Sequence, residues 1–132
     1  MSEMSRALKL PHAFREVRLE LAREKDHPQG ARNFGYMFVA PLDENGQIEP
    51  ELWAAHRDAC RVVRFRPKEA DDKGHLVRRP GGSWAFRYDI SGDEDDEAGY
   101  RFNDERFQVG EYVSIREDEE FHTFRVVSVE PV

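Results

Sequence analysis

The sequence predicts a mainly β (α+β) protein: one antiparallel curled sheet or small barrel of six or seven strands, with a short helix near residues 50–59. Two observations predict this class. Several segments alternate apolar with polar residues. Turn-forming residues separate those segments at hairpin-length distances, which favours antiparallel pairing. A chain of 132 residues with 39% hydrophobic residues has material for one core and leaves no room for a second domain.

The clearest strand signal is in residues 14–21, where Val17, Leu19 and Leu21 alternate with charged residues. The apolar run 34–42 follows a turn-forming stretch and predicts a buried partner strand. Four further segments complete the expected sheet: 60–66, the aromatic segment 84–89, 107–115 and 121–129. The third of these is expected to enter its strand through a glycine turn at Gly110. The polar stretch 68–74 is expected to be a loop.

A short helix is expected after the turn at 43–46. Pro50 stands where the first helical position tolerates proline, and Glu49 and Glu51 complement the positive end of a helix. The spacing of the residues that follow would place five of them on one face of the helix: Leu52, Ala55, His56, Ala59 and Cys60. Residues 1–13 lack a regular pattern and are expected to form a flexible N-terminal arm, so the globular β-rich domain is predicted to span 14–132.

Charge is unevenly distributed along this acidic chain, whose net charge is −7. Residues 61–88 carry eight basic and three acidic residues, whereas 89–132 carry four basic and fourteen acidic residues. Such asymmetry can steer charged partners. The sequence shows neither an apolar run of the ~20 residues that a membrane span needs nor a signal-peptide core. With a single cysteine as well, we expect a cytoplasmic protein without a membrane partner.

A basic, glycine-containing loop at about 64–83 is the strongest candidate site. Two arginines project from one face of a predicted strand, and two more precede a Pro-Gly-Gly turn whose backbone amides could hold phosphate or carboxylate oxygens. The next aromatic residue could stack on a base. The predicted binding residues are Arg64, Arg66, Arg78, Arg79 and Trp84. The leading hypothesis is a non-enzymatic binding module for RNA or an acidic protein surface; the alternative is that these arginines pair with the acidic C-terminal third.

A second hypothesis is a small enzyme or metal protein centred on His56 and Cys60. Residues four apart on a helix share a face, so the imidazole could deprotonate the thiol or both groups could bind one metal ion. The structural interpretation is that both side chains pack inward with the apolar residues of the helix. A third hypothesis is a structural subunit or homodimer without a site of its own.

The acidic segment 92–97 invites comparison with a calcium loop through Asp93, Asp95 and Glu97. Counting from Asp93 places Ala98 where an EF-hand needs glycine and Asp104 where it needs glutamate. A solvated hairpin tip is the better prediction, although weak cation binding stays open. Because the sequence carries no nucleotide-binding glycine motif and no serine-hydrolase elbow, we assign no catalytic residue, metal ligand or cofactor.

Overall fold

The computed structural model describes residues 11–89, 105–117 and 120–132, and the structural statements below concern these residues. Most of the predicted arm 1–13 and all of the acidic segment 92–97 lie outside them. The strands are β1 Phe14–Leu21, β2 Ala31–Pro41, β3 Arg61–Arg66, β4 Glu69–Arg78, β5 Trp84–Tyr88, β6 Tyr112–Glu117 and β7 Glu120–Pro131.

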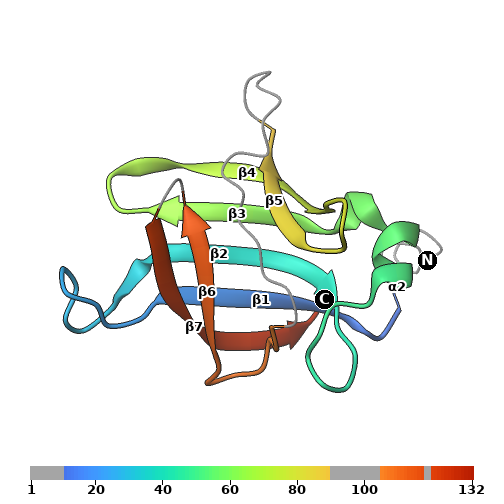
Figure 1. Ribbon diagram of the computed structural model, residues 1–132, viewed down its shortest axis with the longest axis horizontal. Helices are drawn as coiled ribbons and strands as arrows, with labels where there is room; N and C mark the ends of the chain where they lie inside the picture. Colours follow the sequence, from blue (N-terminus) through green and yellow to red (C-terminus); the bar gives the residue numbers. More distant parts are fainter. Residues whose placement is uncertain (1–10, 90–104, 118–119) are drawn as a thin grey trace, which may run out of the picture.

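All seven strands form one antiparallel sheet in the order β5-β4-β3-β2-β1-β7-β6. The sheet curls so that β5 and β6, its two edge strands, both bend over the same face, which gives a half-barrel (Figure 1). The predicted fold class is therefore confirmed, and the described residues include a short helix in the expected region.

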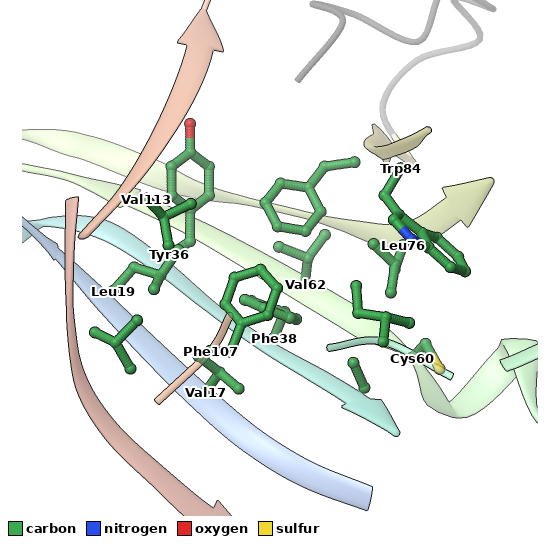
Figure 2. Packing of buried hydrophobic residues seen from close by; sticks show 14 of the residues in the cluster. Val17, Leu19, Tyr36, Phe38, Cys60, Val62, Leu76, Trp84, Phe107 and Val113 are labelled. Carbon is green, nitrogen blue, oxygen red and sulfur yellow. The ribbon is translucent and has the colours of Figure 1, made fainter. Parts of the chain in front are cut away.

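The concave face of the half-barrel holds the core. In β1, Val17, Leu19 and Leu21 are buried, as their alternation with charged residues predicts. At the centre, Phe38 meets Phe86 of β5 and Phe107 with ring centroids 5.5 and 5.2 Å apart. Figure 2 shows this packing of side chains contributed by strands from both halves of the sheet. Burial of these aromatic rings provides the main driving force for closing the sheet.

Local irregularities allow the sheet to bend. The pairing of β1 with β7 shifts between Arg18 and Leu19, which leaves Val127 as an extra residue on β7. Such bulges bend a strand and increase its twist. Gly35 permits a close approach of two strands, because a Cβ there would lie 1.9 Å from the carbonyl oxygen of Leu19.

One segment differs from its sequence-based prediction. Most of the polar stretch 68–74, predicted to be a loop, forms the first six residues of β4, because backbone pairing with β3 and β5 makes the strand while most of its charged side chains stay near solvent. The glycine turn predicted at the start of 107–115 is confirmed, and β6 begins after it at Tyr112. The Phe107 amide donates to the Gly46 carbonyl and Gly110 adopts a φ of +96°, so the chain turns here before pairing.

Helix α2, Pro50–Ala55, lies at one end of the sheet and is followed by the short 3₁₀ helix η1, Arg57–Ala59 (Figure 1). Trp53 is the buried residue of α2; its indole N–H donates to the Leu76 carbonyl at 2.9 Å, and its ring meets Trp84 edge-on. Trp53 therefore marks the side of the helix that faces the core. Helical spacing had predicted a different side, one that includes Ala55, but Ala55 is exposed. In the described part of the chain, every helix is too short and too polar to span a membrane.

Phe38→Ala tests the aromatic core. Phe38 is 1% exposed, so its truncation leaves a cavity, and we expect the free energy of unfolding to fall by about 3–5 kcal/mol in urea denaturation. Phe121→Ala is the matched control, because this ring is 68% exposed and should change stability by under ~0.5 kcal/mol. Equal effects of the two substitutions would contradict the assigned core.

Candidate functional site

Arg64 and Arg66 project from β3 onto the concave face, beside the buried Val62. Only 5% of the Arg66 side chain is exposed, and its guanidinium donates to the carboxylate of Glu117 and lies 3.9 Å from the centre of the Phe34 ring. Arg64 donates to Asp72 at 3.1 Å and to Glu117 at 3.4 Å. Both arginines are thus held by carboxylates.

The Tyr36 hydroxyl completes this arrangement by donating to Glu117. In Figure 2 that hydroxyl points away from the apolar side chains packed around the Tyr36 ring. We call these five residues the Glu117 cluster: Tyr36, Arg64, Arg66, Asp72 and Glu117. Glu117 ends the edge strand β6, whereas Arg66 ends β3, and three strands separate the two in the sheet. The ion pair therefore requires the curled shape and fastens it.

The four predicted arginines do not form one open patch. Asp72 pairs with Arg64 in the sheet register, and Arg78 lies six residues further along the same strand. At about 3.3 Å per residue, the two arginines are separated by roughly 20 Å. The structure instead shows Arg64 and Arg66 paired with acidic residues, including Glu117 from the C-terminal third, as in the alternative interpretation of the sequence.

Glu117→Ala tests the cluster. Removing the carboxylate leaves the Arg66 charge buried without its main partner, and we expect the free energy of unfolding to fall by about 3–5 kcal/mol. Glu69→Ala is the control, because Glu69 is 62% exposed and lies 4.0 Å from Arg64, so its loss should cost under ~1 kcal/mol. Denaturant titration of both variants measures this difference, and similar small losses would show that the cluster does not hold the sheet closed.

The predicted loop at Arg78 and Arg79 joins β4 to β5. The Arg79 amide donates to the Ser83 carbonyl at 2.8 Å, and Gly82 donates back to Arg79 at 3.0 Å. Gly81 and Gly82 both adopt positive φ angles, which glycine reaches without strain. The Arg78 guanidinium lies 5.1 Å from the centre of the Trp84 ring. Trp84 itself is buried, 6% exposed, so it belongs to the core more than to a stacking platform.

A cleft of about 400 Å³ lies against this loop. Arg78, Gly82 and Trp84 line it on one side, but Asp43 and Glu105 line it as well. The Asp43 carboxylate already accepts hydrogen bonds from the backbone amides of two residues that follow it. Because one guanidinium shares the cleft with two carboxylates, its charge is mixed, which is unfavourable for a polyanion.

His56 and Cys60 do not share a helical face, since α2 ends at Ala55 and η1 separates them. The Cys60 sulfur lies 3.6 Å from the His56 backbone oxygen, while the His56 ring packs edge-on against Phe14. Burial raises the pKa of Cys60 from 9.0 to about 12, so the nucleophilic thiolate is not populated near neutral pH. The described residues hold no group of three or more His, Cys, Asp or Glu side chains placed to bind a metal ion.

Cys60 should therefore be unreactive in the folded protein. We expect a thiol reagent at pH 8 to label it only after unfolding in urea, which absorbance of the released chromophore measures. Because the unfolded chain ionises from a pKa of 9.0 while the folded thiol keeps its proton, the free energy of unfolding should also fall as pH rises above about 9. Rapid labelling of the native protein would restore the enzyme hypothesis.

A second basic site, not predicted from the sequence, lies where the β1–β2 connection meets β6 and β7. A groove of about 560 Å³ is lined there by Arg23, Arg32 and Arg125, with Tyr112 beside them. Glu20 is the acidic residue of the lining, and it is already held 2.8 Å from Arg18. Within the described chain, the guanidinium groups of these three groove arginines make no ion pair.

The outward face of the β6–β7 hairpin continues this groove. Its cross-strand pairs are Tyr112 with Arg125, Ser114 with Thr123, and Arg116 with Phe121. All six residues are exposed, including 59% of Tyr112 and 68% of Phe121, and none is acidic. The groove and this face together are called the arginine surface; its members are Arg23, Arg32, Tyr112, Ser114, Arg116, Phe121, Thr123 and Arg125.

The sequence did contain a signal for this surface. Tyr112, Ser114 and Arg116 alternate with the buried Val113 and Ile115, so they form the solvent-facing half of a strand pattern. Linear charge hides that signal, because the segment 89–132, which contains Arg116 and Arg125, carries fourteen acidic and only four basic residues. The comparisons add no further assignment: no protein-family model, curated protein or solved structure matches this chain.

Proposed function

We propose that this protein is a non-enzymatic binding module that contacts an acidic partner through the arginine surface. The observation that carries the proposal is that Arg23, Arg32 and Arg125 line one groove and make no ion pair within the described chain. Hydrogen bonds from guanidinium to phosphate or carboxylate are among the stronger ones in proteins, and the planar group can donate two at once. A partner's oxygens would supply the acceptors that the protein itself does not.

The Glu117 cluster differs from the arginine surface, and this difference supports assigning partner binding to the arginine surface. Arg66 is buried, Arg64 is half-buried, and both are paired with carboxylates, so we assign them to the fold. Arg78, Arg79 and Trp84 remain a second candidate contact site, weakened by the carboxylates in their cleft. The free, buried Cys60 agrees with work in a reducing compartment, and we propose the cytoplasm.

Charge reversal at two places tests which surface binds. The probes are a fluorescent oligothymidylate and a fluorescent polyglutamate peptide, followed by anisotropy at low and at physiological salt. We expect Arg23→Glu/Arg125→Glu to weaken probe binding by about tenfold or more, because two charged hydrogen bonds are lost and two repulsive charges are gained. Binding of the unchanged protein should also weaken as salt rises.

Two controls accompany this experiment. Arg106→Glu reverses one charge at an exposed residue beside Phe107, outside the arginine surface, and should leave affinity within about twofold. Arg78→Glu/Arg79→Glu reverses the other candidate site. If that variant loses binding while Arg23→Glu/Arg125→Glu does not, the contact lies in the Arg78 cleft. If neither probe binds the unchanged protein, the proposed function is wrong.

A further inference from the structure

We infer that the acidic partner is a single-stranded nucleic acid, an inference that rests on the proposed function and assigns its ligand class. The arginine surface carries two kinds of group that such a ligand needs. Guanidinium groups meet the backbone phosphates, and exposed aromatic rings provide faces on which unpaired bases stack. Binding an acidic peptide would require only the first kind.

The aromatic residues are the distinguishing observation. Tyr112 and Phe121 are two of the four large hydrophobic residues that the described chain leaves exposed, and both lie on this one face. Exposed rings of this size gain from being covered. Each sits opposite an arginine in the register, Tyr112 beside Arg125 and Phe121 beside Arg116. Each end of this hairpin face therefore carries the same pair of groups, one aromatic ring and one guanidinium.

The spacing of these units suits an extended strand. Tyr112 and Arg116 are four residues apart on β6, which is roughly 13 Å at about 3.3 Å per residue. Phe121 lies opposite Arg116, so the two rings are far enough apart to stack on different bases of one strand. Ser114 and Thr123 lie between them and supply hydroxyl groups that can bond to phosphate, sugar or base edges.

The groove extends the surface beyond Tyr112. Arg23 lies on the β1–β2 connection and Arg32 near the start of β2, and both line the groove with Arg125. A nucleic-acid strand lying along the hairpin would therefore continue into a positive groove. A duplex fits this arrangement less well, because its bases are already stacked on one another and offer no free faces to the rings. The geometry therefore favours single strands over double strands.

Truncation of both rings tests the inference. We expect Tyr112→Ala/Phe121→Ala to weaken oligothymidylate binding about tenfold or more, since stacking is worth about 1–3 kcal/mol per base, and to leave polyglutamate binding within about twofold. Tyr112→Phe keeps the ring and should bind as the unchanged protein does. Both rings are exposed, so the unfolding midpoint of each variant should be unaltered, which separates lost stacking from lost fold.

Three results would overturn the inference. Equal binding of single-stranded and duplex oligonucleotides would remove the role of unpaired bases. If oligothymidylate binding survives truncation of both rings, phosphate contacts alone would explain it. Polyglutamate binding that is as tight as oligothymidylate binding and depends on Arg23 and Arg125 would point to an acidic protein, and the proposed function would then stand without this inference. If neither polyanion binds, both proposals fail together.

Discussion

The curl of this sheet depends on a mostly buried carboxylate as well as on the aromatic core. Glu117, at the end of an edge strand, accepts from Arg66, Arg64 and Tyr36, which lie on the two middle strands β2 and β3. An open sheet would hold these groups several strands apart. Once the sheet curls, each of the charges in the interior has a partner, and the penalty for burying an unpaired charge disfavours any state in which the sheet opens. The aromatic core and the ion pairs thus favour the same curvature.

The same curvature divides the arginines into two groups. Arg64 and Arg66, on the concave side, pair with carboxylates of the fold, whereas Arg23, Arg32 and Arg125, which line the groove, make no ion pair among the described residues. Net charge therefore does not describe the surface that a partner meets. The chain has a net charge of −7. The described lining of the groove nevertheless contains one acidic residue, Glu20, which is paired with Arg18. Salt would screen both the long-range repulsion from the remaining acids and the attraction between the proposed surface and an acidic partner.

Much of the fold could be predicted from the sequence because its signals are local. Alternation in residues 14–21 and aromatic residues at every second position of 84–88 each identify a buried strand face. The start of β4 could not be predicted in this way, since Asp71, Asp72 and Lys73 carry no apolar period and join the sheet through backbone pairing. The helix was placed correctly but ended early, because a 3₁₀ turn replaces its last predicted turn.

The sequence by itself determined a β protein with a short helix, an apolar face for most strands and an excess of arginine in one segment. Only the tertiary structure decided which arginines are available. Arg66 and Glu117 are fifty-one residues apart in the chain yet share a buried ion pair, and Arg23 and Arg125 come from opposite ends of the chain to line one groove. Charge pairing depends on distances through space, and the curl of the sheet sets those distances.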